Sequence, residues 1–357
     1  MTSTLAGAPR PVAPRAAGPA ARLLPKARAN GGDELWYHWL PAVDRIIPVP
    51  DEYRSPRLDL AEAARELGTT EELLELLVGA GLPAAETADG PRFDYHDIMN
   101  LGLSTGLGRS LAELGERQCL RLAAGQPQAW LTERTTRIRL TATCSAPGCD
   151  GTPPLPAAPR PEGGRLDGFA ADPNEPGSVI ATVTTVGAAD APRSETVRRI
   201  HDDLLDLLLT GEYQYSWLPD ALRERPATAW ENRTVDCVIA AWRMREQARA
   251  AGLEARTRRG FLLGLVGVEH AWTEVLEDGR WLPLDPVLAF LASRHKASNP
   301  DFSRFTCGSF HNRLLAWDRS IEQSLADHTC PHGGRVRVDC RQLPPAPPSS
   351  PVGPGAP

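Results

Sequence analysis

Three residues in the central part of the chain have side chains that could perform nucleophilic catalysis: Cys237, His270 and Asp285. A cysteine thiol is a nucleophile, a histidine can take and return its proton, and a carboxylate can orient that histidine. Each of the three lies in a segment whose local structure can be predicted. An enzyme is therefore the leading hypothesis.

Cys237 is predicted to lie in the first turn of a helix, because apolar residues recur after it at steps of three and four. Thr234 can cap the start, Asp236 suits the positive end, and Gly252 can end the helix in a left-handed conformation. The N–H groups and dipole at this end favour a thiolate and could stabilise an oxyanion beside the sulfur. The apolar positions are Val238, Ala241, Met244, Ala248 and Ala251.

His270 and Asp285 are predicted to lie on the two strands of one hairpin. Asp278-Gly279 is a strong two-residue turn signal between two strand-like runs. Folding about that turn places Asp285 opposite Trp272 and diagonal to His270, at a Cβ separation of roughly 7 Å or less. A carboxylate at that position could reach the imidazole. The runs are 270–276 and 281–285, the second short or at a sheet edge because Pro283 cannot donate to a ladder.

The order and flanking motifs of these residues resemble those of the transglutaminase-like superfamily, which is related to papain-type cysteine proteases. The motifs are G-L-E-A-R at 252–256, H-A-W-T-E-V at 270–275 and W-L-P-L-D-P at 281–286. The resemblance covers roughly residues 195–295 and implies an α+β core, a helix packed on an antiparallel sheet. It implies that Cys237 is the nucleophile, His270 the general base and acid, and Asp285 the orienting residue.

One position departs from the family pattern. Asp236 precedes the cysteine where the family often has a small residue, and its carboxylate opposes a thiolate unless it points away or caps the helix. The second oxyanion donor is not readable from the sequence; Trp272, Gln214 and Trp230 are the candidate site-lining residues.

The expected reaction is acyl transfer at an amide or peptide carbonyl through a thioester on Cys237. Hydrolysis by a peptidase or amidase is favoured over transfer of the acyl group to an amine by a transglutaminase or amide synthase. The alternatives are a catalytically inert binding or regulatory protein, or a cysteine and a histidine that are only structural. No cofactor is expected, and the partners are a peptide or protein substrate and, for a transamidase, an amine.

Residues 57–98 are predicted to form a small helical module. One helix ends near Gly68, and Thr69 or Thr70 can cap the next. The pattern resembles the winged helix-turn-helix of MerR-like regulators. Between Arg57 and Ile98, however, three arginines and no lysine face ten acidic residues, a net charge of −7, whereas phosphate contact needs positive charge. The sequence therefore favours a protein- or peptide-docking module, or a plain structural appendage, over a nucleic-acid-binding one.

Composition and sequence patterns bear on the location and the domain organisation of the protein. The 357 residues have a net charge of −6 and include seven cysteines. The sequence has no apolar run long enough to span a membrane and no signal-peptide pattern, so we expect a cytoplasmic protein with reduced thiols. The expected organisation is a disordered Ala/Pro/Arg-rich tail at 1–32, the helical module at 33–110, the catalytic domain at 111–341 and a disordered Pro-rich tail at 342–357. Strands are predicted at 130–144 and 178–186, and a helix at 194–211.

Four cysteines could bind a structural zinc ion. Cys144 and Cys149 are separated by four residues, and Cys330 and Cys340 lie far along the chain, with His332 between them. These spacings are not the two-residue knuckles of strong zinc motifs. Scattered reduced thiols are therefore the favoured interpretation.

Overall fold

The computed structural model describes residues 36–152, 154–264 and 266–344. The chain forms two compact units. The N-terminal unit contains the described residues up to Gly115 together with 207–222 and 230–234, and the C-terminal unit contains the rest. Residues 1–35 and 345–357 lie outside the described residues, and so do the predicted tail at 1–32 and most of the predicted tail at 342–357.

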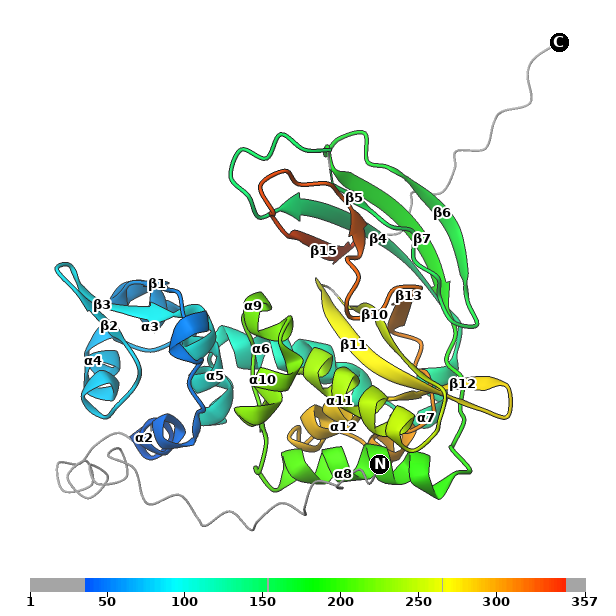
Figure 1. The fold of residues 1–357 in the computed structure, drawn as a ribbon, viewed down its shortest axis with the longest axis horizontal. Helices are drawn as coiled ribbons and strands as arrows, with labels where there is room; N and C mark the ends of the chain where they lie inside the picture. The colour runs from blue at the N-terminus through cyan, green and yellow to red at the C-terminus, as the bar shows by residue number, and fades with distance from the viewer. Residues whose placement is uncertain (1–35, 153, 265, 345–357) are drawn as a thin grey trace, which may run out of the picture. The chain divides into compact units, whose positions relative to one another are not determined.

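The N-terminal unit contains two short capped helices and a three-stranded antiparallel sheet (Figure 1). Asp59 and Glu62 form a capping box at the first helix, Gly68 ends it with φ of 64°, and Thr70 caps the second helix. The two predicted helices are confirmed, whereas the MerR-like identity stays a prediction. The elements are α2 (Trp36–Arg45), β1 (Pro56–Leu58), α3 (Leu60–Leu67), α4 (Glu71–Gly79), β2 (Ala85–Thr87), β3 (Gly90–Asp94), α5 (Tyr95–Thr105) and α6 (Leu111–Cys119).

Residues 207–222 belong to the N-terminal unit because their polar groups bond to it. The Gln214 side chain accepts from the N–H of Ile47 and donates to the carbonyl of Arg45, at 2.5 and 3.1 Å. The Asn100 amide bonds both the N–H and the carbonyl of Trp217. Such contacts between distant segments leave no periodic signal in the sequence.

The C-terminal unit is built on one large antiparallel sheet (Figure 1). Its strand order is β13-β10-β11-β15-β4-β7-β6, and β12 pairs with β11 beside this path. Ile138, Val179, Phe261 and Trp317 are among the buried residues of its core. The strands are β4 (Arg134–Cys144), β6 (Arg165–Ala171), β7 (Ser178–Thr185), β10 (Ala255–Leu262), β11 (Val266–Glu277), β12 (Arg280–Leu284), β13 (Leu314–Trp317) and β15 (Val336–Gln342).

Helices α11 and α12 pack together, and α11 also packs against β10 and β11. The Thr273 hydroxyl on β11 donates to the carbonyl of Ala241 on α11 at 2.7 Å. The expected helix on an antiparallel sheet is therefore present. The helical segments are η2 (Leu120–Ala124), α7 (Pro127–Leu131), α8 (Glu195–Leu209), α9 (Asp220–Arg223), α10 (Pro226–Glu231), α11 (Cys237–Ala250), α12 (Pro286–Ser293) and α13 (Asp301–Phe305). Within the described ranges, none of the helices combines the length and apolarity needed to cross a membrane.

Several local predictions are confirmed. Asp278 and Gly279 both have positive φ, as a type I′ turn requires, and Thr273 pairs with Leu284 in the predicted register. β4 pairs with the whole of β7, from Arg134 to Thr141. It begins at Arg134 and not at the predicted Trp130, because Trp130 lies in α7. The predicted helix at 194–211 is α8.

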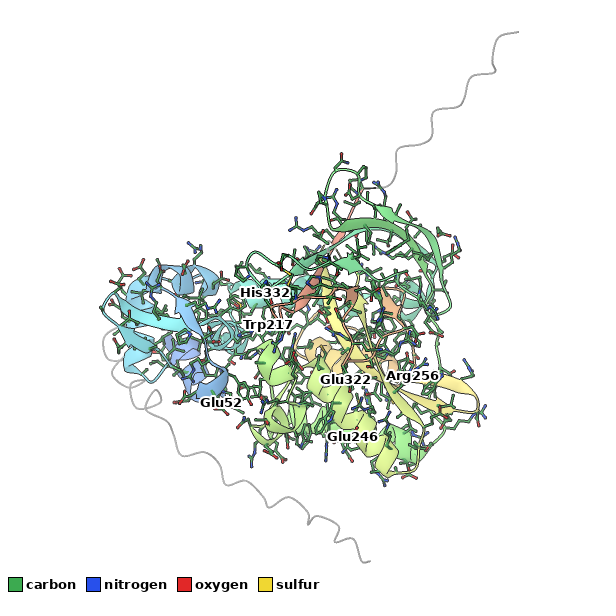
Figure 2. The ribbon with its side chains drawn as sticks, turned by 45° about the horizontal axis from the view of Figure 1, so that its top comes forward. Glu52, Trp217, Glu246, Arg256, Glu322 and His332 are labelled. Carbon is green, nitrogen blue, oxygen red and sulfur yellow. The ribbon has the colours of Figure 1, made fainter. Side chains whose placement is uncertain are left out.

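Glu274 holds a buried polar network on β11. Its carboxylate accepts from Arg256 Nε at 2.7 Å, lies 3.5 Å from Arg258 Nη1, and accepts from Trp272 Nε1 at 3.1 Å. Glu274 is fully buried, and the guanidinium of Arg256 (labelled in Figure 2) also stacks over the Trp281 ring. The network fixes the side chains next to His270.

We expect Glu274→Ala to lower the free energy of unfolding by about 3–5 kcal/mol, because it leaves a buried guanidinium and a buried indole N–H without their acceptor. Urea unfolding followed by tryptophan fluorescence measures this. The matched control is Glu254→Ala at an exposed position, where the change should stay within about 0.5 kcal/mol. Equal effects of the two substitutions would contradict a role for the network.

Candidate functional site

His270 and Asp285 form a direct contact in the C-terminal unit. His270 Nε2 lies 2.5 Å from Asp285 Oδ2, and each residue is 7% exposed. β11 positions the imidazole, and Asp285 is the residue between β12 and α12. The other carboxylate oxygen accepts from the N–H of Leu288 at 3.0 Å and so caps α12. The hairpin register and the helix start therefore both position this carboxylate.

The contact favours a charged imidazolium. Burial alone would lower the pKa of His270, but the Asp285 carboxylate, and then the hydrogen-bonded Cys237, raise it well above the ordinary value. Burial would likewise raise the pKa of Asp285, and the charge of His270 lowers it instead. Because Nε2 bonds to Asp285, the other ring nitrogen of His270 is the one left for the Cys237 proton. The structure thus brings the three predicted residues together.

Cys237 opens α11, with its side chain half-buried. The residue that caps this helix is Asp236, not the predicted Thr234: Asp236 Oδ1 accepts from the N–H groups of Val238 and Ile239 at 2.9 Å each. Thr234 lies instead in the short strand β9 (Thr234–Val235). The Asp236 carboxylate thus bonds to the second and third N–H groups of the helix. It does not bond to the first, which is the N–H of Cys237.

The charge of Asp236 is balanced by Arg223. Arg223 Nε donates to Asp236 Oδ2 at 2.5 Å. Burial would lower the pKa of Arg223, but the nearby charges of Asp236 and Cys237 raise it. The guanidinium is therefore close enough to interact electrostatically with both Asp236 and Cys237. The opposition expected between Asp236 and a thiolate is removed by capping and by this ion pair.

The three candidate oxyanion or substrate-lining residues are bonded or stacked elsewhere. The Trp272 ring lies near His270, with centroids 6.3 Å apart, but its N–H already donates to Glu274. Gln214 bonds to the backbone within the N-terminal unit, and Trp230, in the same unit, stacks on Tyr213. Trp272 can therefore shape the site, but its N–H is not an available oxyanion donor.

His311 is a buried neighbour of the pair that the sequence did not reveal. Its Nδ1 accepts from the N–H of Arg313 at 3.3 Å, and among the described residues its Nε2 has no hydrogen-bond partner. Burial lowers the pKa of His311 to about 3, with Asp285 opposing and His270 adding to the shift. A neutral imidazole therefore lies within electrostatic range of both groups. Its loop position gives no periodic signal, so sequence reasoning had no means of finding it.

The predicted metal-binding cysteines are only partly together. Cys144, Cys149 and Cys330 lie in one cluster with His328, and their ligand atoms are within 4.8 Å of one another. The predicted fourth ligand, Cys340, is instead buried in the core of the sheet. Side chains alternate along β15, and this alternation directs Cys340 into the core.

Residues 180–286 match the family described as the transglutaminase-like superfamily. This match ends one residue beyond Asp285 and includes all three central residues. This segment is thus similar to transglutaminase-like domains, and the match supports a cysteine-dependent acyl-transfer or hydrolase enzyme.

Two further comparisons add little. A solved structure described as "a Putative Cysteine Protease from Cytophaga hutchinsonii" is 12% identical, with a TM-score of 0.27 over 60% of this chain and 93% of that chain. A score this low supports no argument about fold or function. The search of curated proteins gives no match.

We expect Asp285→Asn to lower the pKa of His270. The wild-type imidazole should titrate well above its ordinary value of about 6.5. Without the carboxylate, burial dominates, and the midpoint should fall to about 6.5 or below. NMR of ring-labelled histidine measures both midpoints. Asp301→Asn, an exposed residue at the start of α13, is the control and should not move them. An unchanged His270 midpoint in Asp285→Asn would contradict the assignment.

We expect Arg223→Gln to slow alkylation of Cys237 by iodoacetamide at neutral pH by roughly tenfold, or about 1.4 kcal/mol. The substitution removes the cation that balances Asp236 beside the thiol. Peptide mapping by mass spectrometry gives the rate at each cysteine. Arg225→Gln, at an exposed position two residues on, is the matched control. The idea fails if both variants react at the wild-type rate.

Proposed function

We propose that the protein is a thiol-dependent acyl-transfer enzyme that acts on an amide or peptide carbonyl, with Cys237 as nucleophile, His270 as general base and acid, and Asp285 as orienting residue. The observation that supports this most strongly is the buried Asp285–His270 contact, which lies against a cysteine at a capped helix start. A structural histidine does not need a carboxylate and a thiol on its two sides.

Acylation follows from this arrangement. The Cys237 sulfur, its proton held by His270, attacks the carbonyl carbon; a C–S bond forms and the carbonyl electrons move to oxygen. As that oxyanion collapses, the C–N bond breaks and the imidazolium gives its proton to the departing amine. A thioester on Cys237 remains. The N–H of Cys237 itself is the backbone donor that we assign to the oxyanion, since the cap uses those of Val238 and Ile239.

Deacylation needs an acceptor, and we favour water. His270 removes a proton from the attacking water as its oxygen forms a C–O bond to the thioester carbonyl carbon. The resulting oxyanion collapses, the C–S bond breaks, and the thiolate–imidazolium pair is restored. Hydrolysis gives a carboxylic acid, as in a peptidase or amidase. An amine acceptor would give a new amide by the same steps, as in a transglutaminase or amide synthase.

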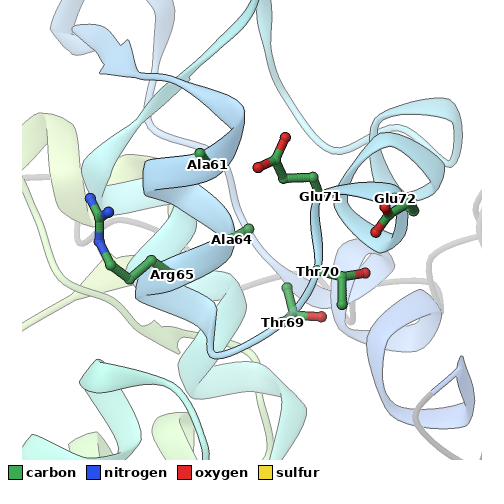
Figure 3. A pocket seen from close by; sticks show the side chains of 7 residues that line it. All are labelled: Ala61, Ala64, Arg65, Thr69, Thr70, Glu71 and Glu72. Carbon is green, nitrogen blue, oxygen red and sulfur yellow. The ribbon is translucent and has the colours of Figure 1, made fainter.

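We also assign substrate docking to the acidic helical module. A hollow between α3 and the start of α4 is lined by Ala61, Ala64, Arg65 and residues 69–72, and Figure 3 shows Glu71 and Glu72 on it. With Glu75, these residues give α4 three carboxylates and no cation. A basic segment of the substrate fits this charge, and nucleic acid does not.

The test is intact-mass spectrometry of the protein after mixing with a panel of peptides, with and without added primary amine. We expect an acyl adduct on Cys237 and the release of hydrolysed product. The panel should include peptides flanked by basic or acidic segments. Cys237→Ala should form no adduct while it keeps the wild-type melting temperature, and Asp285→Asn should keep weak turnover, on the order of 10²–10⁴-fold below wild type.

The matched control is Cys307→Ala. Burial raises the pKa of Cys307 to about 12, so this thiol should take no part. Amine-linked product in place of acid would change the acceptor to an amine. An adduct that survives in Cys237→Ala, or no adduct with any member of the panel, would favour the inert binding protein instead.

A further inference from the structure

A second group of potential ligands lies outside the Cys237 site. It joins Cys144 at the end of β4, Cys149 in the following loop, and His328 and Cys330 in the segment between β14 (Ala326–Asp327) and β15. Cys149 Sγ lies 3.5 Å from Cys330 Sγ and 3.5 Å from His328 Nε2. Four donor atoms from two distant parts of the chain therefore share one small volume.

We propose that these four side chains bind a structural zinc ion with Cys₃His coordination. A tetrahedral zinc ion with Zn–S of about 2.3 Å and Zn–N of about 2.0–2.1 Å places its sulfurs about 3.8 Å apart and sulfur from nitrogen about 3.6 Å apart. The two 3.5 Å separations agree with those values. All four positions are filled by protein, so the site has no open place for substrate and is distinct from the proposed reaction.

The groups around the cluster favour metal binding. His328 Nδ1–H donates to the carbonyl of Thr152 at 2.5 Å, which leaves the lone pair of Nε2 directed to the sulfurs. Fixing the tautomer through the second ring nitrogen is usual for zinc-binding histidines. The N–H of Gly334 donates to Cys330 Sγ at 3.0 Å, which stabilises a thiolate at that position. Three of the four ligands are thus connected by direct contacts, and two are oriented by backbone groups.

Glycines stand at two positions in the loops around the cluster where a larger residue would collide with its neighbours. A Cβ at Gly334 would lie 2.6 Å from Cys144 Sγ, and one at Gly151 would lie 2.1 Å from the carbonyl of Thr329. Both glycines permit an approach that any other residue would block. His332 (labelled in Figure 2), which the sequence placed near the ligands, is outside the cluster. Its Nε2 lies 3.1 Å from Asp150 Oδ1.

The alternative use of these cysteines is a disulfide. Cys149 and Cys330 are free thiols, and their sulfurs are 3.5 Å apart, far beyond the disulfide length of about 2.05 Å. A disulfide would involve only Cys149 and Cys330, and it would not explain why Cys144 and His328 lie beside them. A metal ion uses all four. It would tie the pair formed by β5 (Leu155–Pro156) and β14 to the end of β4 and the start of β15.

The first test is the metal content of the full-length protein, produced in zinc-supplemented medium and purified with a phosphine reductant and no chelator. Inductively coupled plasma mass spectrometry should find about one zinc per chain. Cys330→Ser should lose it, and the matched control Cys307→Ser should keep it. The proposal is overturned by wild-type protein that holds no stoichiometric zinc, or by a Cys330→Ser variant that keeps it.

A second measurement does not depend on how a variant folds. Wild-type protein produced with cobalt in place of zinc should show intense visible d–d bands and a thiolate-to-cobalt charge-transfer band in the near ultraviolet. The weak spectrum of octahedral cobalt would contradict tetrahedral thiolate coordination. A Cys149–Cys330 disulfide in a non-reducing peptide map of protein purified without reductant would also overturn the proposal. Neither result depends on catalysis, so the proposed activity and this site can fail separately.

Discussion

The contact between Asp285 and His270 is the interaction on which the rest of the site depends. Both groups are nearly excluded from water, and burial opposes the charged form of each. The charged form of each residue is favoured only because the charged partner lies 2.5 Å away. Removing one partner would therefore leave an uncompensated buried group. The hairpin turn, the β11–β12 register and the start of α12 must all be correct for this distance to exist.

Two aspartates at the site have the same structural role. Asp236 and Asp285 are the N-terminal capping residues of α11 and α12. One carboxylate oxygen accepts from the helix backbone, from two N–H groups at Asp236 and from one at Asp285. The other oxygen binds a cation, which is Arg223 for Asp236 and His270 for Asp285. Capping satisfies one oxygen, so the remaining oxygen can position a cation without leaving a buried acceptor unpaired. The departure from the family pattern at Asp236 is thus compatible with the chemistry that we propose, and it adds Arg223 as a partner of Asp236.

The difference between local and distant contacts explains what the sequence could predict. The turn at Asp278-Gly279 determines the register of its own hairpin, so the neighbourhood of His270 and Asp285 could be predicted from adjacent residues. Arg223 and His311 approach the site from other segments, and no spacing connects them to it. The hydrogen bond from the Trp272 indole N–H to Glu274 could not be predicted either, because a motif does not show which acceptor a side chain will use. Likewise, Gln214 could be recognised as a possible donor, but its bonds to Arg45 and Ile47 could not be predicted.

The cysteines illustrate how environment decides chemistry where residue type does not. Burial raises the pKa of Cys307 and of Cys340 to about 12, so both remain neutral thiols. Cys237 instead lies at a capped helix start beside a cation and an imidazole. Cys144, Cys149 and Cys330 converge on His328, in the geometry that we propose for zinc. The sequence alone favoured separate, reduced thiols, and it offered Cys340 as one of four possible zinc ligands. The alternation of β15 places Cys340 in the core, and the backbone carbonyl of Thr152 orients His328 to be the fourth donor in its place.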